Sequence, residues 1–247
     1  MTYRFLSKSA VIAMAAFIAA FINASVYAQP ATLPTDNPTL DISTMFEYRI
    51  DDSGVTITWF RWDAQTVIVQ DLIIPERING LPVVAIGDSA FRESSLTSVI
   101  LPDSVTHIGS YAFFETPWLT SVSLPASLTH IGHNAFGGNR LTNITLPDSI
   151  THIGSRAFSR NQLTSITLPN TITHIWHHAF AVNRLTSVIL PDSITFIGND
   201  AFDWNQLTSI TLPDSVTHIG HNAFASNQLT SLSLPASITH IGANAFA

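Results

Sequence analysis

The chain has 247 residues, of which only 11% are charged, and its formal net charge at pH 7 is −7. A protein that reads nucleic acid is expected to carry a basic stripe. This sequence has none, so nucleic acid is a poor candidate partner. The chain also has no cysteine, which excludes disulfides, cysteine-based zinc sites and a lipid-modified N-terminal cysteine.

The first 28 residues have the features of a signal peptide. Arg4 and Lys8 precede an apolar run at residues 10–22 that is too short to span a membrane. Residues 26–28 (Val-Tyr-Ala) place small side chains at the −3 and −1 positions of a cleavage site, so cleavage is predicted after residue 28. An uncleaved N-terminal anchor is the alternative. No second hydrophobic span follows, and we therefore expect no membrane insertion after cleavage.

Two segments precede the repetitive part of the chain. Residues 29–43 are rich in Pro, Thr and Asp, which predicts a flexible linker. Residues 46–50 and 55–60 alternate apolar and polar side chains around an Asp-Asp-Ser-Gly turn, a pattern typical of a β-hairpin. Residues 66–74 form a third β-rich run. The repeats that follow need a cover over their first coil, so we assign residues 44–74 to an N-terminal β cap.

From residue 75 to residue 247 the chain repeats a unit of 22–23 residues. Seven copies open at Leu96, Leu119, Leu141, Leu163, Leu185, Leu207 and Leu229. A fixed period of this length predicts a solenoid. The first copy is divergent and contains an inserted Asn79-Gly80 turn. The last copy is truncated at Ala247, inside a coil, and this open end predicts either a shortened product or self-association through the exposed coil.

Within one unit, the apolar positions predict the core. Leu163, Ile166 and Leu168 are expected to point inward from a short strand that ends at Pro169. A phenylalanine at a fixed later position predicts a stacked spine of eight rings, from Phe91 to Phe246 in successive copies. An asparagine three residues after the phenylalanine of five copies is expected to point inward and to bond backbone groups that would otherwise be unpaired. These residues are Asn139, Asn161, Asn183, Asn205 and Asn227, with Thr116 in the first regular copy.

The unit LTSITLPDSVTHIGHNAF resembles the BspA-like leucine-rich repeat of bacterial surface proteins. That pattern runs Leu-x-x-Ile-x-Leu-Pro-x-x-Leu/Val-x-x-Ile-Gly-x-x-Ala-Phe, followed by a turn that contains Cys, and the likeness covers about residues 74–247. Two departures are clear: the turn Cys is Asn here, in a turn one residue shorter, and Trp176 stands where the pattern has Gly. The resemblance implies an extracellular or surface-exposed binding scaffold, often an adhesin, and no particular ligand. The predicted fold is a β-rich solenoid of the mixed α/β class, a right-handed coil of leucine-rich repeats with an N-terminal β cap.

Histidine forms the most unusual repeated column. Six histidines share one repeat position, with Phe196 in place of a seventh: His107, His130, His152, His174, His218 and His240. Stacked imidazoles could share a metal ion or respond to pH through like-charge repulsion. The simpler interpretation is a half-exposed strand copied by repeat duplication. A zinc site needs three or four converging ligands, so no metal and no cofactor is assigned, and His174, His177 and His178 are the weak candidates.

Catalysis has no support in the sequence. Ser, His and Asp occur in every copy, and nothing singles out one Ser as a nucleophile. The only recurring acid, the Asp after Pro, stands alone at its position, so the paired carboxylates of a glycosidase are absent. The chain is therefore predicted not to be an enzyme.

Irregular side chains on the repeats are the candidates for binding. Tryptophan and arginine are enriched in binding hot spots, and the copies differ in them, as a specific site would require. The candidate ligand-binding residues are Trp118, Arg140, Arg160, Trp176, Arg184 and Trp204, with Arg156 and Asp203 in the same irregular set. The outward Ser and Thr residues of the repeat strands form a second candidate face.

Taken together, these features predict a secreted or surface-exposed, non-catalytic and adhesin-like scaffold that binds an extracellular protein or glycan. A purely structural envelope or matrix protein is one alternative. A metal- or pH-responsive protein that uses the histidine column is the other.

Overall fold

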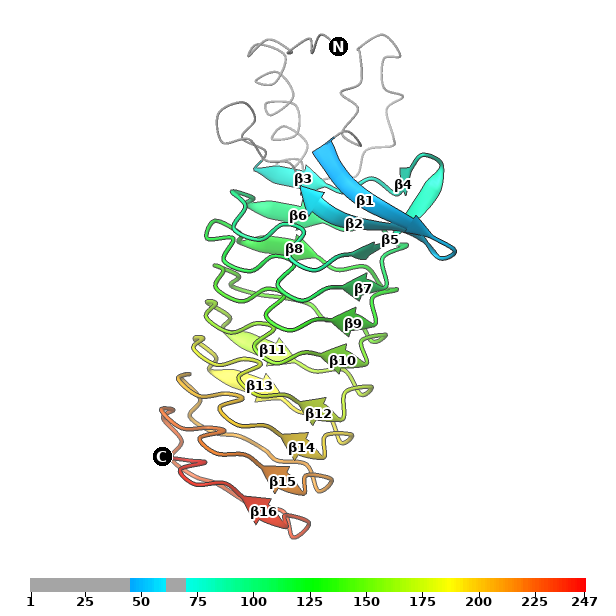
Figure 1. Cartoon of the computed structure of the whole chain (residues 1–247). Helices are drawn as coiled ribbons and strands as arrows, with labels where there is room; N and C mark the ends of the chain where they lie inside the picture. Colours follow the sequence, from blue (N-terminus) through cyan, green and yellow to red (C-terminus); the bar gives the residue numbers. More distant parts are fainter. Residues whose placement is uncertain (1–44, 61–69) are drawn as a thin grey trace, which may run out of the picture.

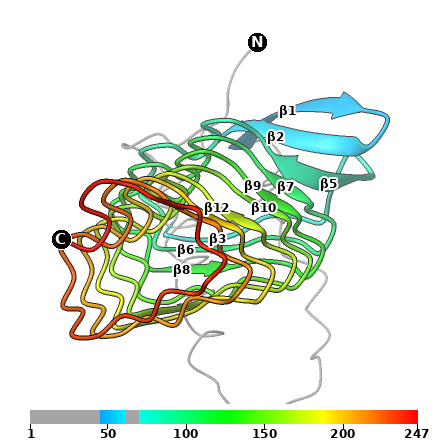
Figure 2. The same cartoon turned by 90° about the horizontal axis from the view of Figure 1, so that it is seen from below.

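The computed structural model describes residues 45–60 and 70–247, which form a β-solenoid whose coils stack along one axis (Figure 1). The predicted leader and linker, and the first part of the third β-rich run, lie outside the described residues. Seen from below, the coils have similar outlines and are offset stepwise from one another (Figure 2). No helix among the described residues is long and apolar enough to cross a membrane.

Two sets of short parallel strands lie on different sides of the coil (Figure 1). We call the first set the histidine strands: β5 (Leu81–Ile86), β7 (His107–Ile108), β9 (His130–Ile131), β10 (His152–Ile153), β12 (His174–Ile175), β14 (Phe196–Ile197), β15 (His218–Ile219) and β16 (His240–Ile241). We call the second set the serine strands: β3 (Asp71–Ile73), β6 (Ser98–Ile100), β8 (Ser121–Ser123), β11 (Ser165–Thr167) and β13 (Ser187–Ile189). Paired strands in successive coils are in register, so each repeat position becomes a column along the axis.

The predicted core is confirmed. Leu163, Ile166 and Leu168 are buried, and Ser165 and Thr167 between them are exposed, as strand alternation requires. The phenylalanine rings stack nearly parallel from coil to coil, with centroids 5.0 Å apart at the first step from Phe91 and 5.6 Å apart at the step to Phe180. This spine fills the interior of every coil.

The inward asparagines also behave as predicted. The buried side-chain amide of Asn183 donates to the carbonyls of Phe158 and Phe180, at 2.9 and 3.1 Å, and its oxygen accepts the N–H of Leu163 at 3.0 Å. Each of the other four makes the corresponding pair of donations to phenylalanine carbonyls. Thr116 substitutes by donating its hydroxyl to the carbonyl of Phe91 at 3.2 Å. These bonds tie each coil to the preceding one at the same turn.

The predicted cap hairpin is present. Strands β1 (Phe46–Asp51) and β2 (Gly54–Phe60) pair antiparallel, and β2 continues the sheet by pairing parallel with β5. The Phe60 ring lies 5.3 Å from the Phe91 ring, so the cap adds an aromatic layer above the first phenylalanine of the spine. The inserted turn is also confirmed: β4 (Arg77–Ile78) pairs with β5 through Asn79 and Gly80, whose φ angles of 51° and 78° suit a tight hairpin.

The described residues contain no α-helix. The β-rich solenoid is therefore confirmed, but no helix covers its second side, as a mixed α/β class would imply. The Ala-Phe segment of each coil takes a different backbone path.

Candidate functional site

The Ala-Phe segment of every coil but the last contains two residues in the left-handed region, and the last contains one, Asn244. In the coil that opens at Leu163 they are His178 and Val182, with φ of 55° and 58°. This geometry lets the N–H groups of 178, 180 and 182 reach the carbonyls of 199, 201 and 203 in the next coil, at 2.9, 2.9 and 2.8 Å. Residues other than glycine are disfavoured in the left-handed region. The hydrogen bonds between coils therefore offset the conformational free energy that these residues cost. Only Gly138 marks one of these positions with glycine, so the sequence carried almost no signal for them.

The residues on either side of each buried asparagine point outward and form two adjacent columns. Trp118, directly before Leu119, holds the position that Arg140 and Arg184 hold before Leu141 and Leu185. We call six exposed residues of these columns the Trp–Arg ridge: Trp118, Arg140, Arg160, Val182, Arg184 and Trp204. All six side chains are exposed, Trp118 by 53%, Val182 by 44% and Trp204 by 64%. The stacking of coils therefore gathers five of the six predicted binding residues on one edge. Trp176 lies elsewhere, and Val182 is an addition that the sequence did not single out.

The arginines of the ridge have few partners of their own. The Arg140 guanidinium lies over the Trp118 ring, 4.6 Å from its centroid, as a cation–π pair. Arg160 and Arg184 form no ion pair with any residue of the described ranges, whereas Arg92 near the cap is paired with Glu93 at 3.0 Å. The guanidinium groups of the ridge are thus available for an external anion.

A second column runs along the histidine strands, and we call it the aromatic column: His107, His130, His152, Trp176, His174, Phe196, His218 and His240. Its rings stack on one another, with centroids 4.6 Å apart for His107 and His130 and 4.3 Å apart for His218 and His240. The ring faces of this column are therefore largely covered by neighbouring rings.

Threonine hydroxyls bond two histidines at the top of the column. The Thr129 oxygen lies 3.0 Å from the carbonyl of Thr106 and 2.8 Å from Nδ1 of His130. Thr106 lies in the same way 3.3 Å from the carbonyl of Val84 and 2.7 Å from Nδ1 of His107. Nδ1 of each ring is therefore already engaged within the fold.

Trp176 interrupts the column and the sheet beneath it. At the other junctions the residue at this position is Gly, and its N–H bonds the preceding coil, as in Gly198 to Ile175 at 2.8 Å. A Cβ built at Gly154 would come within 2.7 Å of the Gly132 backbone, so the coils approach this closely only where the side chain is absent. Within residues 70–247, the junction at Trp176 alone lacks this bond, and the histidine strands divide there into sheets that end at β10 and begin at β12. Trp176 is therefore a wedge between coils.

Burial perturbs several ionisable groups. The pKa values of His107, His152 and His218 are lowered, mainly because burial disfavours the charged ring and secondly because a neighbouring histidine would repel it. Burial likewise lowers the pKa of His178, although Asp200 at 3.6 Å partly opposes the change. Burial raises the pKa of Asp203, a half-buried carboxyl.

The weak metal candidates have other roles in the described structure. His174 stacks on Trp176, with centroids 5.4 Å apart, and Nδ1 of His177 accepts the N–H of Asn199 at 2.9 Å. His178 lies beside Asp200. In the described ranges, no three His, Asp or Glu side chains are grouped so that they could hold a metal ion.

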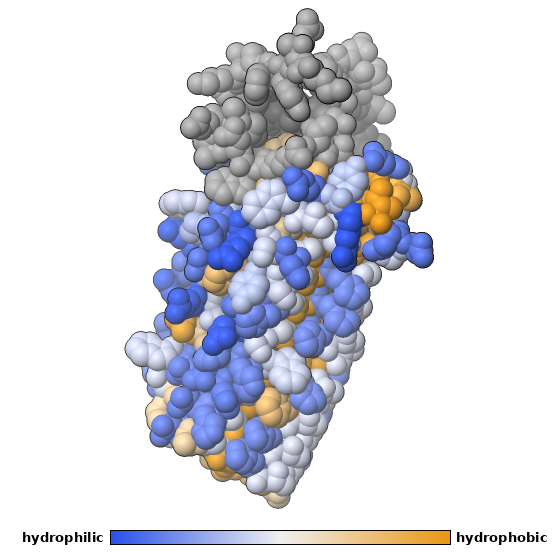
Figure 3. All heavy atoms as spheres, viewed as in Figure 1, coloured by the Kyte–Doolittle hydropathy of each residue, from blue (hydrophilic) through white to orange (hydrophobic). Residues whose placement is uncertain are grey.

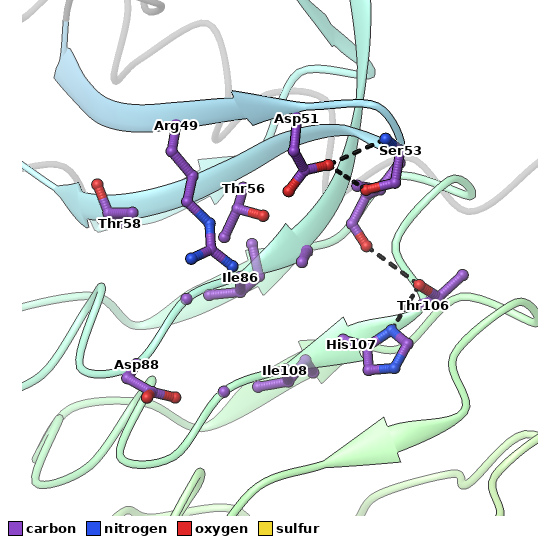
Figure 4. Close-up of a pocket in the computed structure, with 14 residues that line it drawn as sticks. Arg49, Asp51, Ser53, Thr56, Thr58, Ile86, Asp88, Thr106, His107 and Ile108 are labelled. Carbon is purple, nitrogen blue, oxygen red and sulfur yellow. Dashed lines mark hydrogen bonds between the residues drawn. The ribbon is translucent and has the colours of Figure 1, made fainter.

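A hollow that the sequence did not predict lies under the cap hairpin. It is an open groove of about 740 Å³ between β1, β2 and the first histidine strands, with Arg49, Asp51, Asp88 and His107 among its lining residues (Figure 4). The Asp51 carboxylate accepts bonds from the Ser53 backbone and hydroxyl, at 3.0 and 2.5 Å, which lower its pKa. Both acids of this groove therefore already accept hydrogen bonds, Asp51 from its own turn and Asp88 from the Ser110 N–H at 2.7 Å.

The face of the serine strands is largely polar. It exposes Ile100 and Ile189 by 45% and 61%, and carries a shallow hollow of about 330 Å³ beside Ser121 and Asn143. The face seen in Figure 3 is hydrophilic or neutral over most of the stack, with narrow apolar streaks and its broadest apolar area at the cap end. Exposed aromatic and basic side chains occur together on the Trp–Arg ridge instead.

The chain is similar to known leucine-rich repeat structures. A leucine-rich repeat protein from Bacteroides ovatus is 24% identical with a TM-score of 0.62, over 80% of this chain and 60% of that one. A leucine-rich repeat protein from T. pallidum is 26% identical with a TM-score of 0.52, over 81% of this chain and 84% of that one. The chain thus spans about 60% of the length of the B. ovatus protein. No match was found among curated proteins.

The repeats themselves match a described family, the BspA type leucine rich repeat region, in six copies over residues 84–206 and 177–247. The matched residues form the coils described above and carry the ridge and the aromatic column. Their extent, well over half of the sequence, shows that the chain belongs to the BspA-type leucine-rich repeat family.

Proposed function

We propose that the protein is a non-catalytic binding scaffold at the cell exterior, and that it holds a protein or glycan ligand along the Trp–Arg ridge. The observation that carries this proposal is the ridge itself. It combines exposed tryptophans with arginines that form no ion pair among the described residues, on a frame fixed by the buried asparagines. Rigid positioning of such side chains lowers the entropic cost of binding. Proteins of this family form leucine-rich repeat solenoids in bacteria, which suits a scaffold rather than an enzyme.

The predicted leader supplies the route to the exterior in this proposal. Residues 1–28 carry the basic start, apolar core and small-residue cleavage site of an export signal. An adhesin-like role requires this export, so fractionation of producing cells is the first measurement. Retention of the intact chain in the cytoplasm would contradict an exterior role.

A glycan and matrix-protein array tests the binding role. The purified protein is expected to bind at least one class of ligand, and the variant Trp204→Ser is expected to lose at least half of the signal. Ser226 occupies the same repeat position two residues after Phe224, so this change places a residue that the coil already accepts. An array without signal would favour a purely structural envelope or matrix role.

A further inference from the structure

We propose that the ligand of the Trp–Arg ridge is a linear acidic polysaccharide, whose carboxylate or sulfate groups pair with Arg140, Arg160 and Arg184. This inference rests on the proposed binding role and specifies its ligand class. It is carried by the distribution of charge, by the spacing of the arginines and by the shape of the ridge.

Charge is divided unevenly along the chain. Residues 137–184 contain four arginines and one acidic residue, Asp148, for a net charge of +3. The rest of the chain carries six basic and sixteen acidic residues, a net charge of −10. In this segment Asn170 also replaces the Asp that follows Pro in most copies. A cationic band on an otherwise acidic protein attracts an anion to one place and repels it elsewhere.

The arginines form a line rather than a cluster. Arg140 and Arg184 hold the same repeat position two coils apart, and successive coils in this part of the stack are spaced by 5.5 and 5.6 Å along the phenylalanine spine. Arg160 lies in the adjacent column, in the coil between them. A chain that presents an anion at regular intervals can meet all three guanidinium groups, each of which can bond a carboxylate or sulfate in bidentate fashion.

The other exposed groups of the ridge suit sugar rings. Trp118 and Trp204 stand toward its two ends, and the electron-rich face of an indole attracts partly positive C–H groups such as those on one face of a pyranose. Beside the ridge, the half-buried Gln162 and the exposed Gln206 share the repeat position of Arg184 and offer amide donors and acceptors for hydroxyl groups. Charge, stacking and polar bonding thus recur along one narrow track.

The shape of the ridge disfavours a folded protein as the ligand. A stable protein interface buries about 800 Å² on each partner around an apolar centre. The ridge is two residues wide in each coil, and the two hollows described above lie beside the cap and on the serine strands. An extended, charged chain fits this track better.

The test measures affinity for heparin, which is sulfated, and polygalacturonate, which is carboxylated, with dextran as the neutral control. The unmodified protein is expected to bind at least one acidic chain and not dextran, and to bind more weakly as salt rises. Arg184→Gln is expected to weaken binding about tenfold through loss of a charge-assisted bond. Gln already occupies this position in two neighbouring copies, so the variant should fold. The matched control is Arg49→Gln, which removes the same charge in the cap hairpin and should leave the affinity unchanged.

Three results would overturn the inference. They are failure to bind either acidic polysaccharide, equal binding of dextran, and equal weakening by Arg49→Gln and Arg184→Gln. If the ridge variants lose an array signal for a protein or a neutral glycan instead, the binding role stands and the acidic ligand is wrong. If neither the array nor the acidic polysaccharides bind, both proposals fail.

Discussion

The Trp–Arg ridge and the aromatic column run along the same solenoid, but their side chains differ in how much they contact the rest of the protein. Column residues repeat, and they stack on one another and bond neighbouring threonines. Ridge residues differ from coil to coil, and except for Arg140 on Trp118 they contact little. The comparison teaches that regular repetition marks stacking within the fold, whereas the irregular side chains of the ridge make few contacts within the described residues.

The largest effect is expected where the ridge meets the interior. Asn183→Ala removes the acceptor of the Leu163 N–H in a buried turn, and one of the two amide donors to each of the Phe158 and Phe180 carbonyls. We therefore expect the free energy of unfolding to fall by about 1–3 kcal/mol. Urea denaturation measures the loss. Arg184→Gln, one residue away on the ridge, is the control and should change stability by less than about 0.5 kcal/mol. Similar losses in both variants would mean that the ridge is part of the framework.

A lower pH is expected to reduce stability through the histidines of the aromatic column and not through the ridge. The pKa values of His107, His152 and His218 lie below the unfolded value, so the unfolded chain binds more protons in the interval between the two. The stability that these lowered pKa values confer is fully present above the unfolded pKa of about 6.5, and it declines as the pH falls through that value. Asp203, whose pKa is raised, acts in the opposite direction at lower pH.

The measurement is the melting temperature at pH 7.5 and 5.5 at constant ionic strength, which should be lower at pH 5.5. Addition of zinc or of a chelator at pH 7.5 should leave it unchanged. An equal melting temperature at both pH values would contradict a pH-responsive role for the column. A higher melting temperature with zinc would support a metal-binding role instead.

The wedge at Trp176 should be visible in amide exchange. The amides of Thr173 and Trp176 lack the bonds to the preceding coil that Thr151 and Gly154 make, so they should exchange faster with deuterium. Trp176→Gly is expected to close this junction and protect both amides, through bonds worth about 0.5–1.5 kcal/mol each. The amides at Thr195 and Gly198 serve as protected references. Unchanged exchange in the variant would show that another feature holds the coils apart.

The smallest effect concerns the strained backbone of the ridge. Val182 is β-branched and has φ of 58°, a conformation that costs about 1–2 kcal/mol relative to glycine. Glycine loses about 0.5–1 kcal/mol in backbone entropy, so Val182→Gly should raise stability by up to about 1 kcal/mol. Val188→Gly, at a strand position, should instead be destabilising. A loss of stability in Val182→Gly would show that the valine side chain contributes packing that outweighs the strain.

Much of the architecture was predictable because the repeat makes each local pattern an average over seven copies. The periodic Leu, Ile and Phe positions predicted the core, and the recurring Asn predicted the buried turn, since burial demands apolar or fully bonded side chains at fixed intervals. The signal peptide, the linker and self-association through the last coil stay predictions.

What only the tertiary structure decided is how columns form from residues 22 positions apart. The sequence determined that Trp118, Arg140, Arg160, Arg184 and Trp204 are irregular, but stacking placed them on one edge and sent Trp176 to another. The left-handed turns could not be predicted from the sequence either, because hydrogen bonds to the next coil stabilise them whereas the local conformational preference of their residues opposes them. The physical reason is the same in both cases: contacts between coils, not neighbours along the chain, determine what each outward residue faces.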